Sequence, residues 1–185
     1  MIFKYLNHIK FILFLYFFLI NSAYSEILKY IQINGNDRIS NKTIEMFGNI
    51  EVGDNLNSID LNNVLKKIYE TNFFENVSVN LDKNILTINV IEYPIIQNIN
   101  YNGIKANKIK DVVFNNLKLK PRSSFVKIFL QNDKKKIESS LKELGYYFSK
   151  VDIDLINLED NKVDITYNIE LGKKAKIKKI SFIGN

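Results

Sequence analysis

The sequence predicts an α+β protein built from tandem β-α-α-β-β repeats, and three observations support this fold class. A motif of alternating apolar residues that ends in glycine occurs three times, at Gly35, Gly103 and Gly184. The first two motifs are each followed by two stretches with the apolar spacing of amphipathic helices. Each copy then closes with two alternating apolar stretches around a polar turn, as in a β-hairpin. Recurrence of this order every ~70–80 residues indicates repeated domains, each a three-stranded sheet covered by two helices.

The first strand of each repeat is predicted from strict alternation, which places one set of side chains on one face of a sheet. The alternating pairs are Ile31 with Ile33, and Ile99 with Tyr101. The glycine after each pair suits a turn with positive φ. A short helix is expected next, over residues 41–47 in the first repeat, with Ser40 as its cap, and over residues 108–117 in the second.

A second helix is predicted in each repeat from an apolar stripe at three- and four-residue spacing. The stripes are Leu61, Val64, Leu65 and Ile68, preceded by Ser58, and Ile137, Leu141 and Leu144, preceded by Asp133. Asn72 and Gly145 then suit the left-handed residue that ends a helix. Hairpins are expected over residues 77–90 and 151–169. The aromatic run at residues 146–148 is interpreted as core filling rather than a binding patch.

Residues 1–25 are predicted to be a secretory signal peptide that is cleaved before Glu26. Lys4 and Lys10 give a positively charged region before an uninterrupted apolar run over residues 11–20, and small residues precede the expected cleavage point. As a helix, this run spans only ~15 Å, against the ~30 Å hydrocarbon core of a bilayer. An uncleaved N-terminal anchor is the alternative interpretation.

The repeats divide the rest of the chain into three expected parts. Residues 26–94 form the first repeat, residues 95–174 the second, and residues 175–185 the first strand of a third. A lone strand has an unpaired edge and nothing to pack against. The sequence is therefore expected to be a truncated piece of a longer protein.

The composition excludes several classes of active site. The chain has no Cys, and its single His, His8, lies in the predicted leader. Disulfides, thiolate metal sites and histidine-based catalysis are therefore not expected, and no phosphate loop or acid-pair motif is present. We predict no enzyme, metal or cofactor. The net charge is +6, and lysine residues cluster at residues 134–136 and 173–179. These clusters are interpreted as solvated faces of the protein. Nucleic acid is not an expected partner, because the chain is predicted to be exported.

The junction between second helix and hairpin carries a family resemblance. Residues 69–79 read YETNFFENVSV and resemble the first polypeptide-transport-associated (POTRA) repeat of the outer-membrane β-barrel assembly factors. Asn72 replaces the family's glycine, a mild departure because asparagine tolerates a left-handed backbone. The positions that resemble the second POTRA repeat, and the linker after it, are residues 132–138, Gly145, Val151, residues 161–165, Leu171 and Gly172.

The resemblance implies a periplasmic POTRA region attached to the outer membrane through a C-terminal barrel that lies beyond this sequence. Such a region docks unfolded outer-membrane β-barrel proteins and accessory lipoproteins for membrane insertion. The resemblance also implies how such partners bind: an extended segment adds to the second strand, in chain order, of each repeat through backbone hydrogen bonds. The candidate edge residues are Val77, Ser78, Val79, Val151, Asp152, Ile153 and Asp154. The apolar residues among them are expected to face the helices. Asp152 and Asp154 could equally serve to prevent aggregation through the exposed strand edge.

Other functions fit the same pattern less closely. A related translocation or secretion barrel also carries periplasmic POTRA repeats, although the start of a third repeat opposes the two-repeat secretion type. A division-type periplasmic adaptor has one repeat after a membrane anchor, which the cleavable leader and the repeated copies oppose. An unrelated soluble binding module is a further alternative.

Overall fold

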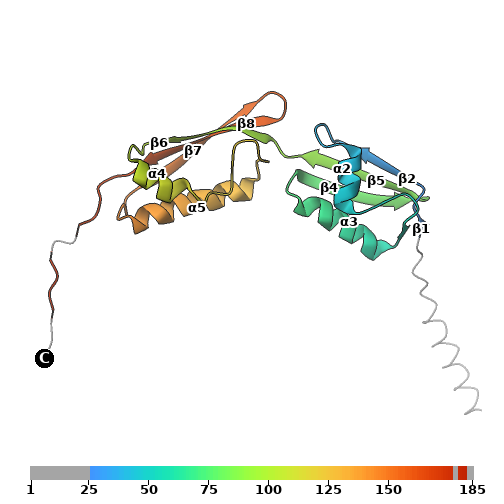
Figure 1. Ribbon diagram of the computed structural model, residues 1–185, viewed down its shortest axis with the longest axis horizontal. Helices are drawn as coiled ribbons and strands as arrows, with labels where there is room; N and C mark the ends of the chain where they lie inside the picture. Colours follow the sequence, from blue (N-terminus) through green and yellow to red (C-terminus); the bar gives the residue numbers. More distant parts are fainter. Residues whose placement is uncertain (1–25, 177–178, 183–185) are drawn as a thin grey trace, which may run out of the picture.

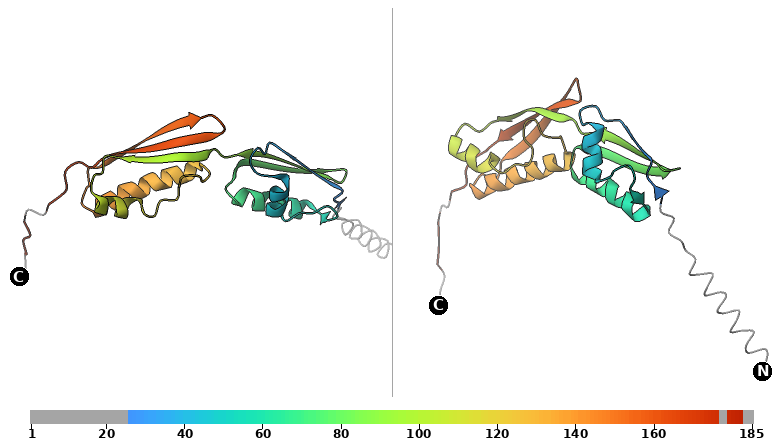
Figure 2. Two further views of the ribbon diagram at one scale, coloured as in Figure 1. Left: turned by 45° about the horizontal axis from the view of Figure 1, so that its top comes forward. Right: turned by 45° about the vertical axis from the view of Figure 1, so that its right-hand side comes forward.

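The computed structural model describes residues 26–176 and 179–182, and these form two α+β domains joined end to end (Figure 1). The predicted signal peptide lies outside the described residues. In both domains the helices cover one face of a small sheet, and the two helical layers lie on the same side of the molecule (Figure 2). Among the described residues, no helix combines the length and apolar character needed to cross a membrane. The predicted fold class is confirmed.

The first domain contains a three-stranded sheet in the order β2-β5-β4 and a two-stranded β1-β3 pair. Strand β2 runs parallel to β5, whereas β4 runs antiparallel to it. The parallel pair needs a long connection, which α2, α3 and β4 supply. The elements are β1 Glu26–Ile27, β2 Tyr30–Asn34, α2 Asn41–Gly48, β3 Asn55–Leu56, α3 Ser58–Glu70, β4 Phe74–Asp82 and β5 Ile85–Glu92.

The second domain repeats this arrangement with the strand order β6-β8-β7. Strand β6 runs parallel to the central strand β8, and β7 runs antiparallel to it. Tyr93 and Pro94 alone separate the last strand of the first domain from the first strand of the second. The elements are β6 Ile95–Asn102, α4 Asn107–Phe114, α5 Lys127–Glu143, β7 Lys150–Leu158 and β8 Lys162–Glu170.

Each domain has its own apolar core between the helices and the inner face of the sheet. The central strands β5 and β8 alternate between buried and more exposed positions, as the sequence pattern predicts. The helices contribute the residues of their predicted stripes. The fully buried anchors include Ile44, Ile68, Leu86 and Ile88 in the first domain, and Ile137, Leu141, Ile165 and Tyr167 in the second.

The helix ends largely follow the local sequence. Ser40 caps α2, because its Oγ accepts a hydrogen bond from the Thr43 amide at 3.2 Å. Helix α3 is capped one residue before the predicted Ser58. Asn57 accepts from the amide of Asp60, whose carboxylate accepts in return from the Asn57 amide, and this forms a capping box. Asn72 has the predicted left-handed backbone, with φ of 60°.

Two expectations for the second domain are wrong. Helix α5 begins at Lys127, so Asp133 lies inside it and is buried, where it accepts hydrogen bonds from the amides of Lys118 and Leu119. Of the aromatic run, Tyr146 packs against the core, whereas Tyr147 and Phe148 are 60% and 78% exposed. Both residues precede β7, which begins at Lys150, so the alternation of the strand does not turn either side chain towards the core.

The predicted first strand of a third repeat lies partly outside the described residues. Residues 175–176 and 179–182 are in neither helix nor strand. A single strand acquires its regular structure from hydrogen bonds to a neighbour, and both three-stranded sheets are already complete without this segment. A third repeat therefore stays a prediction.

Buried Tyr167 and half-buried Tyr101 make the second domain sensitive to alkaline pH. Burial raises the pKa of Tyr101 to about 12, with a further contribution from Asp133. Burial also raises the pKa of Tyr167, whose ring stacks on Tyr101 at 5.3 Å. The folded chain therefore keeps protons that the unfolded chain releases above the ordinary tyrosine pKa of 10.0. This stabilisation is complete below about pH 10 and is lost as the pH rises towards about 12.

We therefore expect the double variant Tyr101→Phe, Tyr167→Phe to lose less thermal stability than the wild-type protein between about pH 9 and about pH 11. Circular dichroism melting curves at the two pH values measure this loss. Tyr147→Phe is the matched control, because that ring is exposed, and it should behave like the wild type. An equal loss in the double variant would contradict the assignment.

Candidate functional site

The two sheets each have a long strand at one edge. Within the described residues, β4 pairs with β5 and β7 pairs with β8, and each has one neighbouring strand in its sheet. An edge strand directs alternate backbone N–H and C=O groups away from its sheet, where another chain can bond to them. The seven predicted residues all lie in these strands. The structure therefore brings them to two separate edges, one in each domain.

In β4, the side chains of the predicted residues divide between the two faces. Val77 is buried and Val79 half-buried against the helices, whereas Ser78 is exposed on the opposite face. Asn89 of the neighbouring strand donates to the Ser78 Oγ at 3.3 Å. The outer face of this edge is thus neutral and polar at Ser78, and the apolar side chains are committed to the core.

In β7, the same division places two acids outward. Val151 is buried and Ile153 half-buried, whereas Asp152 and Asp154 are exposed. Asn168 of the central strand donates to Asp154 at 2.7 Å, which holds that carboxylate against its own sheet. Farther along the strand, Leu155 and Ile156 are 45% and 57% exposed. The β7 edge therefore combines acidic and apolar side chains next to its outward backbone groups.

The opposite edge of the second sheet is partly covered. Ile95, at the start of β6, forms an isolated antiparallel bridge with Ser124. Ile96 donates its amide to the Ser123 carbonyl at 2.9 Å and accepts at its own carbonyl from Arg122 at 2.7 Å. The loop before α5 thus occupies backbone groups that an added strand would need. Strand β7 consequently offers the longer uncovered edge of this domain.

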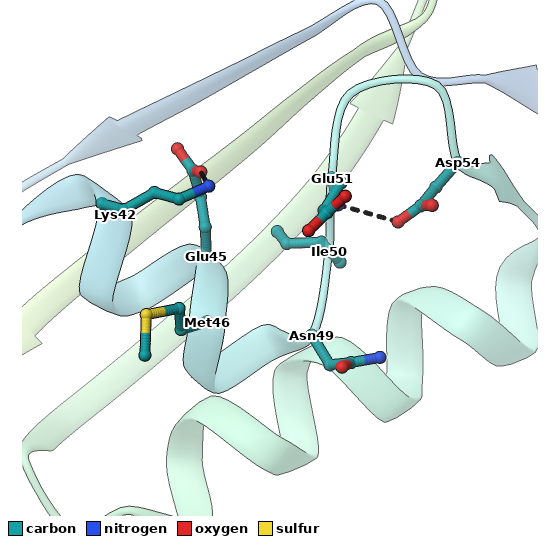
Figure 3. Close-up of a pocket in the computed structure, with 7 residues that line it drawn as sticks. All are labelled: Lys42, Glu45, Met46, Asn49, Ile50, Glu51 and Asp54. Atoms are coloured by element: carbon teal, nitrogen blue, oxygen red, sulfur yellow. Dashed lines mark hydrogen bonds and ion pairs between the residues drawn. The ribbon is translucent and has the colours of Figure 1, made fainter.

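An open cleft of about 390 Å³ lies beside α2 and is lined by charged and apolar side chains (Figure 3). Three of its charged side chains, those of Lys42, Glu45 and Asp54, already have partners. Lys42 Nζ lies 3.1 Å from Glu45 Oε2, and the Glu51 amide donates to Asp54 Oδ2 at 2.8 Å. In the part of the chain that the structure describes, no group of three or more His, Cys, Asp or Glu residues is placed to hold a metal ion.

Sequence reasoning missed a carboxylate that organises the end of the first domain. Glu92 is buried, and its Oε1 accepts from the amides of Asp37, Arg38 and Ile39 at 3.0, 3.1 and 3.0 Å. Its Oε2 lies 2.9 Å from Arg38 Nε, a close charge contact without the alignment of a hydrogen bond. The sequence indicates this burial, because Glu92 occupies the next inward-facing position in the alternation of Leu86, Ile88 and Val90.

Comparison with known proteins agrees with this architecture. Residues 94–172 match the POTRA family model, described as "Surface antigen variable number repeat". The chain is 26% identical over 180 residues to the outer membrane protein assembly factor BamA of Neorickettsia risticii, covering 91% of this chain and 23% of that protein. It is 31% identical over 159 residues to BamA of Neisseria meningitidis serogroup B, covering 84% of this chain and 20% of that protein. The chain thus spans about a fifth of these relatives.

A solved structure shares the fold. The N-terminal domain of Omp85 from the cyanobacterium Thermosynechococcus elongatus superposes with a TM-score of 0.51 at 15% identity, covering 78% of this chain and 63% of that one. The fold and the free edges define a protein of tandem POTRA-type domains. The chain belongs to the BamA/Omp85 family, of which it represents a POTRA region.

Proposed function

We propose that this chain is the periplasmic docking arm of an outer-membrane β-barrel assembly factor and has no catalytic role. Its partners are extended segments of unfolded outer-membrane proteins and accessory assembly lipoproteins, and its attachment to the outer membrane is a barrel beyond this sequence. The observation that carries the proposal is the strand order, which puts β4 and β7 at the edges of their sheets. The names of the similar BamA proteins support the assignment to outer-membrane assembly.

Strand addition suits a partner that varies in sequence. Backbone hydrogen bonds supply the attraction, and they are the same for any extended segment, whereas side chains contribute only through alternation. Val77 and Val151 remain in the core during such binding, so docking leaves each domain folded. Ser78, Asp152 and Asp154 lie beside the added strand, where cross-strand pairs contribute roughly 0.2–1 kcal/mol each. We expect broad specificity with modest preferences set by these outward side chains.

Proline substitution in β7 tests the proposed edge. In an edge strand of an antiparallel pair, neighbouring residues direct their N–H groups alternately towards the partner strand and away from it. Of Asp152→Pro and Ile153→Pro, one therefore removes an outward donor and the other breaks the pairing with β8. We expect the variant that keeps its melting temperature to lose crosslinking to an unfolded outer-membrane protein. Unchanged crosslinking in that folded variant would count against the β7 edge.

The corresponding experiment in β4 uses Ser78→Pro and Val79→Pro, with melting curves to identify the variant that stays folded. Loss of crosslinking in one domain alone would show which edge docks the partner. The wider proposal is tested by sequencing the gene beyond the codon for Asn185. Further repeats followed by alternating strands of ~10 residues support an assembly barrel, and their absence would contradict it.

A further inference from the structure

The two hairpin turns end in the same residue with the same backbone conformation. Asn84 has φ of 67° and Asn161 has φ of 51°, and each follows a residue that also has positive φ. Such turns match the right-handed twist of the strands they join and favour asparagine. Turn formation alone therefore explains an asparagine at these positions, but it does not use the side-chain amide.

In both domains the asparagine also holds the chain that enters the domain. In the first, the Asn84 carbonyl accepts from Lys29 at 2.8 Å, and its Nδ2 donates to the Ile27 carbonyl at 2.6 Å. In the second, the Asn161 carbonyl accepts from Ile95 at 2.9 Å, and its Nδ2 donates to the Glu92 carbonyl at 3.2 Å. The captured carbonyl lies three residues before the first residue of β2 or β6 in both cases.

This shared geometry has a different consequence in the second domain. Glu92 is the last residue of β5, so the bond from Asn161 crosses from the second domain to the central strand of the first. The same glutamate binds the loop at residues 37–39. Glu92 thus connects the hairpin of the second domain, through its backbone carbonyl, to the loop that follows β2 in the first, through its side chain.

The rest of the linker is tied to one domain or the other. Tyr93 donates to the Phe73 carbonyl at 2.9 Å, and its own carbonyl accepts from Arg38 at 3.0 Å, so Tyr93 belongs to the first domain. The Pro94 carbonyl accepts from Phe125 at 2.7 Å, so Pro94 belongs to the second. The change of domain therefore takes place at the single peptide bond between these two residues.

Little packing supports the joint on the side of the hairpin. An open cleft of about 300 Å³, lined by Asp37, Arg38, Glu92, Asp160 and Asn161, separates the loop from the turn. The side chain of Asn161 lines this cleft and donates to the Glu92 carbonyl. Domains whose interface is neither large nor hydrophobic are expected to move relative to one another, and on the hairpin side the residues between the two domains are polar.

We propose that Asn161 is a latch that fixes the angle between the two domains. The hydrogen bond from its side chain to the Glu92 carbonyl converts a two-residue linker into a defined joint. The equivalent Asn84 performs the same local task at the entry to the first domain, where it cannot affect the inter-domain angle. The latch is a property of the joint and does not depend on which partner the sheet edges bind.

The distance distribution between the domains tests this proposal. The chain has no Cys, so spin labels can be placed at Lys66→Cys in α3 and Lys135→Cys in α5, both of which are exposed. Asn161→Gly removes the side chain and tolerates positive φ. We expect the distribution measured by electron–electron double resonance to become about twice as wide. Asn84→Gly makes the same chemical change in the other turn and should leave the width unchanged.

A second variant separates loss of the donor from greater flexibility of the turn. Asn161→Asp keeps the size and the turn preference of the side chain but removes the amide donor, so it should widen the distribution as well. Circular dichroism spectra establish that each variant is folded. Wild-type width in both Asn161 variants, or equal widening in Asn84→Gly, would overturn the proposal.

Discussion

Gly103→Ala is expected to abolish stable folding of the second domain. Gly103 follows β6 with φ of 92°, and a Cβ there would overlap the carbonyl oxygen of Ile169 in the central strand. Neither group can move away, because both belong to the backbone of the sheet and its exit turn. We expect a loss of more than about 4 kcal/mol, the range reserved for strain or overpacking at a constrained site. Gly35 occupies the equivalent position over Val90 in the first domain.

Gly145→Ala provides a matched control in the same domain. Gly145 has the same φ of 92°, but a Cβ there would meet only the flexible side chain of Lys174. Its cost should therefore be that of a left-handed alanine alone, roughly 1–2 kcal/mol. Hydrogen exchange of peptides from β6, β7 and β8 would report the stability of the second domain separately from the first. Similar protection in the two variants would show that the close approach is not the cause.

The order of elements was predictable because it depends on local periodicity. Alternation in β5 and β8 and the stripe along α3 belong to segments with one face in a core, and such segments show their period directly. The left-handed conformations of Asn72 and Gly145 followed in the same way from their place after a helix. Repetition strengthened each assignment, since the two copies carry the same order.

The errors occurred where contacts distant in sequence decide the structure. Asp133 was expected near a helix start, where aspartate is common. It is instead buried inside α5, where it accepts hydrogen bonds from the amides of Lys118 and Leu119 in the loop before the helix. The sequence indicated this burial through spacing, because Asp133 lies on the same helix face as Leu130, Ile137 and Leu141. An acid in phase with apolar residues indicates a buried carboxylate with backbone partners.

The candidate site was predictable only in part. Periodicity identified the strands that contain Val77 and Val151, but it does not determine which strand lies at an edge. The edge position came from the family resemblance, and the strand order agrees with it. The cover over β6 was not predictable, because the bridge from Ser124 to Ile95 depends on how an irregular loop folds back. The Asn161 contact was not predictable, because turn formation alone accounts for an asparagine at that position.

Glu92→Ala is expected to destabilise the first domain by about 2–4 kcal/mol, because hydrogen bonds to a charged group are among the stronger ones. Three amides of residues 37–39 lose their acceptor, and Arg38 loses its ionic partner. Chemical denaturation with hydrogen exchange of β2 and β5 peptides measures this effect. Glu170→Ala is the matched control, because Glu170 is also the last residue of a closing strand but is exposed.

Glu92→Gln separates the acceptor from the charge. An amide oxygen can still accept from the loop amides, whereas the attraction to Arg38 disappears, so we expect an intermediate loss. If the glutamine variant is as unstable as the alanine variant, the ion pair is the dominant contribution. If it matches the wild type, the acceptor alone organises the loop. A Glu92→Ala variant as stable as Glu170→Ala would show that the carboxylate does not hold the end of the first domain, because the buried group could then be removed without cost.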